Sequence, residues 1–595
     1  MGSPKSYIRQ PKDGYGKLRC TIIGAGMSGI LMAYKLRKYL AGSVDFQILE
    51  KSPELGGTWY ENRYPGFVSS SEIQSYLKGV VRHFDLDRFI RYNSKVTSAK
   101  WSASAGTWTV EVDGGQTITS EILVNASGIL NNYKMPDMPG LRSFAGPVLH
   151  TAAWDPTVDL RGKRVAIIGS GASAIQVLPQ IQPMASRVQV YIRTPSWICQ
   201  PLGVPVGMDP AHRYSEEEKA SFRSDGAAYL HARKEIESQF NSMLGVFVKG
   251  SPEQRDARAR FEARMREVIQ DPRLQETLIP DFEVGCRRVS PGEPFLRALQ
   301  EANVEPVFAA VEKVSADGIV AGGVSRKTDV IVAATGFNTS FRPRFSIVGL
   351  DGVDLCDEWK DTATSYMGTG VAGFPNYLIF LGPNTPISNG SALGPIEGTS
   401  DYFIRLLRKM VRQRVKSFTV KPECQADFDL HTQTLMQDMV WTGTCRSWFK
   451  HGPSGKVTAL WPGSSLHYLQ VLSEDRWEDY DWEYENERYT YWGSGVSWVE
   501  DPRGDPLGID ARESWKMSTV PRPGADLAFY LVESDPLPKD VMPEFDSTQQ
   551  SATEASLSEQ TRWEDMDKAI SGTDKDAVVA ATLDLLPTAV TVRAS

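Results

Sequence analysis

The sequence predicts an α/β fold class, and three observations predict it. The short apolar run Leu18–Ile23 leads into a glycine-rich turn and a helix, which is the order of a strand–turn–helix unit. The same order returns from Arg164. Two later apolar strands, at residues 121–128 and 329–336, end in small residues and a glycine, which leave room for a bound nucleotide. We therefore expect two nested Rossmann-like dinucleotide-binding domains, with a helical insertion and a C-terminal extension.

The composition excludes several classes of protein. A chain of 595 residues is too long for a single core. Its net charge of −8, from 65 basic and 73 acidic residues, argues against nucleic acid as the main partner. No apolar run reaches the roughly 18 residues of a membrane span, and the polar segment 1–17 does not match a signal peptide. The expected localisation is cytoplasmic, while the oligomeric state is not fixed by the sequence.

The six cysteines lie far apart, and no two form a C-x-x-C pair. Such spacing predicts neither a disulfide framework nor a zinc site, and it suits a reducing compartment. It also argues against a flavin disulfide reductase, which needs a cysteine pair beside the flavin.

The first predicted unit has the full context of a dinucleotide site. Its turn carries Gly24, Gly26 and Gly29, which permit a tight turn, close approach of a pyrophosphate and helix packing, and Ser28 lies between them. A helix over Ile30–Leu40 and a strand over Val44–Leu49 follow. The strand ends at Glu50, which would accept hydrogen bonds from the adenosine ribose. This acid-ended unit suits FAD.

The second unit ends in a cation instead of an acid. A strand over Arg164–Ile168 leads into a turn and helix start that carry Gly169, Gly171, Ala172 and Ser173. The next strand closes with Arg193-Thr194, and a guanidinium there can fork onto a 2′-phosphate. This unit suits NADPH rather than NADH.

The repeated strands imply that the chain returns to the first domain after about residue 336. Between the units, residues 211–278 predict helices that start at two capping boxes, Ser215 with Glu218 and Ser251 with Gln254. Residues 545–560 look like a linker or a disordered tail, and Gly493–Gly495 like a turn. The predicted domains are FAD-binding (1–143 and 329–505), NADPH-binding (144–210 and 280–328), a helical insertion (211–279) and a partly disordered extension (506–595).

Several segments resemble Baeyer–Villiger monooxygenases, which are FAD- and NADPH-dependent enzymes. The run GGTWYENRYPG at residues 56–66 is similar to the family's flavin-proximal segment. Residues 144–155 fit its fingerprint F-x-G-x-x-x-H-x-x-x-W-P/D, and Ala334–Phe337 fits a later marker. Fungal members of secondary metabolism are the most similar. The resemblance implies that FAD and NADPH also contact Gly57, Thr58, Trp59, Tyr60, Asn62, Val96, Gly336 and Trp448, and that His150 is not a catalytic base. Within the similar segment Cys445–Trp448, Trp448 either contacts the nicotinamide nucleotide or packs in the core.

The resemblance places the catalytic role on Arg288, with Arg287 near the NADPH phosphate. Oxygen insertion beside a ketone carbonyl develops negative charge at the flavin and on the substrate, and an arginine stabilises both because it stays protonated. Adjacent residues of an extended segment point to opposite faces, so only one of the two can face the flavin. The implied reaction converts a hydrophobic ketone and dioxygen into an ester or lactone.

The sequence departs from the family after Gly66, where a block with a flavin-proximal aspartate is absent. Either the gene model has lost a piece, or the protein has diverged. As written, the chain is expected to bind FAD less tightly and to release hydrogen peroxide. Two alternatives remain: an N- or S-oxygenating flavin monooxygenase, and an impaired paralogue that acts as a binding or regulatory protein.

Overall fold

The structure is a computed structural model that describes residues 17–65, 70–201, 214–385, 389–452, 454–489 and 527–528. The predicted turn at Gly493–Gly495, the linker at 545–560 and nearly all of the C-terminal extension lie outside these residues. So does the junction at Gly66 where the family's block is absent.

The first sheet has five parallel strands in the order β19-β7-β1-β2-β3. Its strands β1 and β2 have the predicted bounds. Helix α1 (Met27–Tyr39) begins directly after Gly26, so it starts before the predicted Ile30 and includes Gly29. Ile22 and Ile23 of β1 and Ile48 and Leu49 of β2 are buried, so the carboxyl ends of both strands lie in the core. The strands are β1 (Leu18–Ile23), β2 (Val44–Leu49), β3 (Ile90–Arg91), β7 (Ile122–Asn125) and β19 (Tyr377–Ile379).

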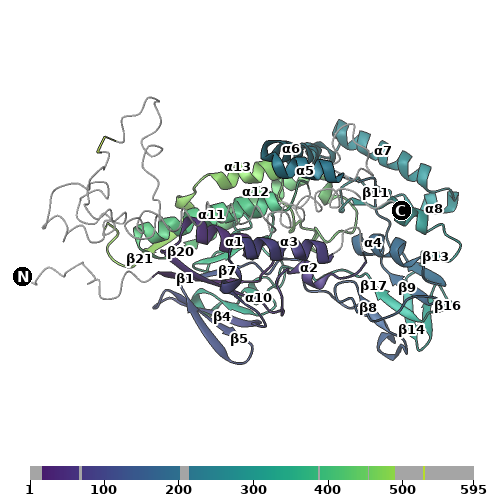
Figure 1. Cartoon of the computed structure of the whole chain (residues 1–595), viewed down its shortest axis with the longest axis horizontal. Coiled ribbons are helices and arrows are strands. Elements are labelled where there is room, and N and C mark those ends of the chain that lie inside the picture. The colour runs from purple at the N-terminus through teal and green to yellow at the C-terminus, as the bar shows by residue number, and fades with distance from the viewer. Residues whose placement is uncertain are drawn as a thin grey trace, which may run out of the picture.

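The second sheet repeats this plan in the order β13-β10-β9-β17-β8, again all parallel. Helix α4 (Ala172–Ile181) follows its glycine turn as α1 follows the first. Figure 1 shows the two sheets side by side along the long axis of the molecule. The strands are β8 (Val148–His150), β9 (Arg164–Ile168), β10 (Arg187–Tyr191), β13 (Val304–Val307) and β17 (Val330–Ala333).

The nested order follows from β19, which comes after the second sheet in sequence but pairs with β7 of the first. The two connections between the sheets run antiparallel to each other: Tyr133 bridges Phe337, and Asn338 N donates to Asn132 O at 2.7 Å. The predicted fold class of two nested Rossmann-like domains is therefore confirmed. The domain boundaries stay a prediction.

Smaller sheets flank the two nucleotide folds. A mixed sheet packs on the first fold, with β4, β5 and β6 antiparallel and β18 parallel to β4. An antiparallel sheet lies against the other fold, and two short pairs complete the set. In order they are β18-β4-β5-β6, β14-β15-β16, β11-β12 and β20-β21. The strands are β4 (Val96–Ser102), β5 (Thr107–Val112), β6 (Gln116–Ser120), β11 (Ile198–Cys199), β12 (Ser290–Pro291), β14 (Val311–Ser315), β15 (Gly318–Ala321), β16 (Val324–Lys327), β18 (Ser346–Val348), β20 (Val415–Val420) and β21 (Tyr480–Tyr484).

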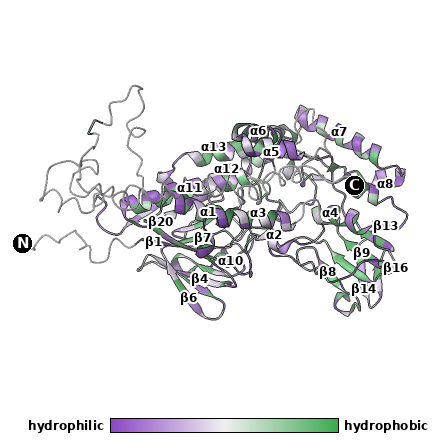
Figure 2. Ribbon diagram, viewed as in Figure 1, coloured by the Kyte–Doolittle hydropathy of each residue, from purple (hydrophilic) through white to green (hydrophobic). Residues whose placement is uncertain are grey.

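The predicted helical insertion is present, and Figure 2 shows hydrophilic residues along its helix α7 and hydrophobic residues on strand β9 of the second sheet. Ser215 forms the predicted capping box with Glu218. Ser251 caps α7 through the backbone N–H of Gln254, so here one half of the box is formed. The helices are α5 (Glu216–Ser224), α6 (Gly226–Asn241), α7 (Pro252–Val268) and α8 (Pro272–Leu278).

The remaining helices pack around the first fold and its C-terminal part. Helix α11 buries one face against α1 and α13, within the same apolar cluster as β1 and β2. No helix among the described residues is long and apolar enough to cross a membrane. These helices are α2 (Thr58–Glu61), α3 (Ser70–His83), α9 (Glu293–Ala298), α10 (Leu355–Glu358), α11 (Leu393–Gln413), α12 (Pro422–Leu435) and α13 (Ser465–Ser473).

Candidate active site

The first glycine turn is packed as tightly as the sequence predicts. Gly24 has a φ of +104°, and a Cβ on it would lie 2.8 Å from Ala126 O at the end of β7. A Cβ on Gly29 would lie 2.0 Å from Gly24 O, so only glycine lets α1 pack this close to the turn. The N-terminal end of α1, where Ser28 is buried, thereby meets the end of the sheet. Backbone N–H groups at such an end bind phosphate.

Glu50 lies at the end of β2 and is 4% exposed. Its carboxylate accepts hydrogen bonds from Ala25 N and Ser52 N, each at 2.8 Å. A carboxylate has about four acceptor positions. Glu50 therefore holds the glycine turn in shape and keeps acceptor capacity for ribose hydroxyls.

The flavin-proximal segment meets the same turn. A Cβ on Gly57 would lie 3.1 Å from Gly26 Cα, so two glycines face each other and keep a gap that side chains would narrow. Helix α2 carries Thr58, Trp59 and Tyr60 and ends at Asn62, whose N–H bonds to Thr58 O at 2.9 Å. These residues fit FAD: the cradle is open where the pyrophosphate would lie, and an acceptor stands where the ribose would lie.

Val96 is a different case among the predicted flavin contacts. It starts β4, is 6% exposed and belongs to the core of the mixed sheet. Ser94, two residues earlier, donates its backbone N–H to Glu50 O at 2.8 Å, which brings this segment to the ribose end of the cradle. A flavin contact at Val96 would thus involve the backbone.

The second turn repeats the first. Gly169 has a φ of +119°, and a Cβ on it would lie 2.5 Å from Ala334 O at the end of β17. A Cβ on Gly171 would meet nothing within 4 Å, so the space in front of Ala172 and Ser173 at the start of α4 is open. Ser170 Oγ donates to Thr194 O at 2.9 Å and fixes the end of β10 beside the turn. Gly336 ends the neighbouring strand segment with a φ of +79°.

Arg193 and Arg287 come together beside this turn. Arg287 donates from Nη1 to Pro195 O at 3.1 Å, two residues beyond Arg193. Desolvation, and next the charge of Arg193, lower the pKa of Arg287. Two like charges held at close range indicate an anion site, because an anion would relieve their repulsion. A 2′-phosphate fits that description.

Arg288 has different surroundings from its neighbour. Its side chain keeps solvent contact, yet the surrounding protein is dense enough that desolvation lowers the pKa of its guanidinium. An arginine stays charged under such a shift. The two adjacent arginines therefore offer two separate cationic positions.

Cys286 and Cys445 form a disulfide, so the prediction that the cysteines do not pair is wrong. The two lie 159 residues apart in sequence and are 0% and 4% exposed. Spacing rules detect local pairs, and this pair is created by the fold. The sequence held one signal for this pair: the segment of Arg287 and the segment of Trp448 were both predicted to contact NADPH, and each contains one of the two cysteines.

Trp448 follows Cys445 in that second segment. It is partly buried, and its ring lies 4.9 Å from that of Phe449, against an apolar cluster with Trp441. Lys450, which the sequence analysis did not single out, donates to Gly443 O at 2.5 Å, and burial lowers its pKa. Trp448 is thus placed near the Arg287–Arg288 loop by the disulfide, and its nicotinamide contact stays a prediction.

His150 in the fingerprint is buried and neutral. Its Nδ1 accepts from Ala152 N at 3.0 Å, its ring stacks on Tyr133 at 4.6 Å, and burial lowers its pKa to about 4. A histidine that is neutral and fully bonded fits the expectation of a structural residue.

A hydrogen bond that was not predicted joins the flavin-proximal segment to α4. Gln176 Nε2 donates to Tyr64 Oη at 3.3 Å, and burial raises the pKa of Tyr64. Sequence alone holds no signal for this pair, since the two folds are joined only in three dimensions.

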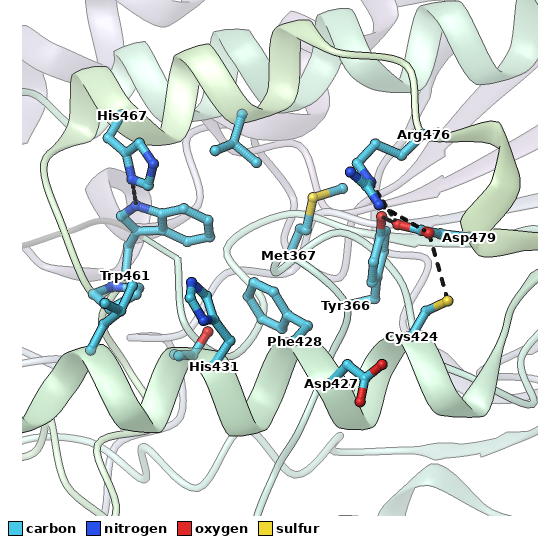
Figure 3. A pocket seen from close by; sticks show the side chains of 14 residues that line it. Tyr366, Met367, Cys424, Asp427, Phe428, His431, Trp461, His467, Arg476 and Asp479 are labelled. Atoms are coloured by element: carbon cyan, nitrogen blue, oxygen red, sulfur yellow. Dashed lines mark hydrogen bonds and ion pairs between the residues drawn. The ribbon is translucent and has the colours of Figure 1, made fainter.

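A pocket of about 390 Å³ lies away from all these residues, between α12 and α13 (Figure 3). Phe428, Trp461 and Met367 make its apolar side, and Arg476 paired with Asp479 makes its polar side. No predicted cofactor residue lines it.

The two cradles, one ended by an acid and one by an arginine, define a flavoprotein that takes electrons from a nicotinamide nucleotide. The sequence model of flavin-binding monooxygenase-like proteins matches residues 60–241, and that of NAD(P)-binding Rossmann-like domains matches residues 22–85. The FAD-binding monooxygenase stcW of Emericella nidulans is 40% identical over 79% of this chain and 83% of its own length. A Baeyer–Villiger monooxygenase of Pseudomonas aeruginosa is 33% identical over 77% of this chain and 90% of its own.

Solved structures agree with these relatives. Cyclohexanone monooxygenase from Rhodococcus sp. Phi1, bound to NADP⁺, has a TM-score of 0.69 at 26% identity and covers 78% of this chain and 99% of its own. Oxidised steroid monooxygenase bound to NADP has a TM-score of 0.66 at 25% identity, with coverages of 79% and 100%. The chain belongs to the Baeyer–Villiger type of FAD-binding flavin monooxygenases. The predicted family, enzyme class and pair of cofactors are thus confirmed.

Proposed function

We propose that this chain inserts one oxygen atom of dioxygen beside the carbonyl of a hydrophobic ketone, at the expense of NADPH, to give an ester or lactone. The observation that carries the proposal is the pair Arg287 and Arg288, whose side chains have separate surroundings. We assign one cation, Arg287, to the nucleotide phosphate and the other, Arg288, to the reacting oxygens.

The chain's residues divide the work. Bound FAD, once reduced by NADPH, supplies the activated oxygen. Gly24, Gly26 and Glu50 hold the flavin nucleotide by its pyrophosphate and ribose, and Arg193 with Arg287 holds the 2′-phosphate of NADPH. Arg288 stabilises the negative charge that develops on oxygen.

The test separates reduction from oxygenation. Arg288→Ala should leave anaerobic flavin reduction by NADPH largely intact, while ester formation falls by about 10²-fold or more. Arg446→Ala is the matched control, because Arg446 is an exposed arginine next to Cys445. Normal ester formation by Arg288→Ala would refute the assigned role.

The substrate class rests on similarity to fungal relatives. The FAD-binding monooxygenases stcW of Emericella nidulans and moxY of Dothistroma septosporum, the latter 39% identical over 83% of this chain, support a role in fungal secondary metabolism, with a polyketide or terpenoid ketone as substrate. A panel of such ketones, assayed beside amines and sulfides, tests this. Turnover of amines or sulfides but not ketones would favour an N- or S-oxygenating enzyme.

A colourless purified chain that ignores NADPH would instead favour a binding or regulatory protein. We propose a cytoplasmic site of action, which fractionation of the producing cells would check.

A further inference from the structure

The disulfide Cys286–Cys445 joins the two loops on which the proposed chemistry depends. Cys286 lies between α8 and β12 and directly precedes Arg287 and Arg288. Cys445 lies after the short helix Val440–Thr442, three residues before Trp448. One bond therefore ties the loop of the two arginines to the loop of the predicted nicotinamide contact.

The two loops are also in close non-covalent contact. A Cβ on Gly443 would lie 3.2 Å from Cys286 Sγ and 2.8 Å from Glu283 Oε2. A Cβ on Gly285, whose φ is +85°, would lie 2.5 Å from Cδ1 of Phe247, which belongs to the helical insertion. The disulfide thus sits where the arginine loop, the Trp448 loop and the insertion meet.

The positions of the other cysteines give a contrast. Cys20, Cys199, Cys356 and Cys424 are free thiols. None of the four lies next to a predicted nucleotide contact in a loop, and Cys356 donates to the carbonyls of Pro343 and Phe345, both at 3.4 Å. Oxidation and reduction of the 286–445 pair would therefore act on the nucleotide site in a way that the other thiols cannot.

We propose that the disulfide is a redox-sensitive positioning crosslink, which holds the Arg287–Arg288 loop against the Trp448 loop and so strengthens NADPH binding. This inference rests on the proposed function, since it assigns NADPH to these loops. The oxidation is balanced as two thiols and hydrogen peroxide giving the disulfide and two waters. In the reverse direction, an external dithiol gives up two electrons and two protons to the disulfide and itself closes to a cyclic disulfide.

Linkage makes the proposal testable without turnover. If the crosslink favours the loop arrangement that binds the nucleotide, the nucleotide must in turn favour the crosslink. The sulfurs are buried, so a dithiol reaches them only when the loops part. NADP⁺ should therefore slow reduction of the disulfide in the FAD-loaded full chain.

The first experiment measures that rate. Dithiothreitol is added with and without NADP⁺, and the appearance of thiols at Cys286 and Cys445 is followed by alkylation and mass spectrometry. We expect saturating NADP⁺ to slow reduction about tenfold. An equal rate with and without NADP⁺, or free thiols at both positions after peroxide treatment, would overturn the proposal.

The second experiment measures the reverse coupling by anaerobic flavin bleaching with NADPH. The reduced wild type and Cys286→Ser should need about tenfold more NADPH for half-maximal bleaching rate, and peroxide should restore the wild type but not the variant. Cys356→Ser is the control and should respond to dithiol and peroxide as the wild type does. Identical NADPH dependence of oxidised and reduced wild type would contradict the proposal even if Cys286→Ser folds poorly.

These readouts need no ketone. Absence of ester formation would therefore contradict only the proposed function. Ester formation together with an NADPH dependence that is the same in the oxidised and reduced protein would contradict only the crosslink proposal.

Discussion

Arg287 lies beside Arg193 at the end of strand β10, with its guanidinium anchored on Pro195 O at 3.1 Å. The two side chains reach this place from segments that are far apart in sequence. The two positive charges repel each other. An anion bound by both guanidinium groups would offset this repulsion, which explains why they lie together.

The first prediction concerns this pair. Arg193→Ala should raise the KM for NADPH by about 10²-fold and leave the KM for NADH nearly unchanged, because only NADPH has the 2′-phosphate. Steady-state NADPH and NADH oxidation measures both values. Arg161→Ala, at an exposed arginine paired with Asp159 on the same fold, should change neither. An equal loss with both nucleotides would mean that Arg193 does not recognise the phosphate.

A second prediction concerns the flavin cradle. Gly29→Ala places a Cβ 2.0 Å from Gly24 O, so α1 must move away from the turn. We expect FAD affinity to fall by about 10²-fold, or a colourless protein, because the helix end no longer faces the pyrophosphate. The flavin content after desalting reports this. Gly226→Ala is the control, since a Cβ there meets nothing within 4 Å and Gly226 starts a helix; a yellow Gly29→Ala protein would count against the cradle.

A third prediction follows from the pKa of His150, which burial lowers to about 4. As the pH falls, the imidazole of the unfolded chain takes up a proton near pH 6.5, whereas that of the folded chain stays neutral until about pH 4. The free energy of unfolding is therefore highest above pH 6.5 and decreases as the pH falls towards 4. At pH 5 the loss is about 2 kcal/mol. Urea unfolding at pH 7 and 5 should therefore show less pH sensitivity for His150→Gln than for the wild type. The exposed His231, changed to Gln, should keep the wild-type slope; identical slopes for all three proteins would be the contrary result.

A fourth prediction concerns the block that is absent after Gly66. In the family this block carries a carboxylate near the flavin. Because the chain lacks the block, we expect it to release hydrogen peroxide. Insertion of the corresponding segment of a fungal relative between Gly66 and Phe67 should lower the ratio of peroxide formed to NADPH consumed. A Gly/Ser insertion of equal length is the control. An unchanged ratio after the native insertion would remove this explanation.

Much of the fold could be predicted because local patterns specify it. The bounds of β1, β2 and β9 match the predicted strands, and the Ser215 box forms as expected, since each depends on residues close in sequence. The glycine turns were likewise predictable. A Cβ on Gly29 or Gly24 would lie 2.0 Å or 2.8 Å from a backbone carbonyl oxygen, so only glycine fits there.

The contacts that unite the two folds could not be predicted in this way. The disulfide Cys286–Cys445 and the hydrogen bond from Gln176 to Tyr64 join segments that only tertiary packing brings together. The role of Arg193 and Arg287 at the NADPH phosphate was predicted, but their proximity was not. It depends on the loop in which Pro195 O accepts a hydrogen bond from Arg287.

The antiparallel bridge between Tyr133 and Phe337 has a consequence for how this molecule could be built. The chain leaves the first fold and returns to it at one place, where Asn338 N donates to Asn132 O at 2.7 Å. A linker of a few residues would be long enough to join these two connections directly. The second fold could therefore be removed, or exchanged for one with a different nucleotide specificity, while the strand order of the first sheet stays the same.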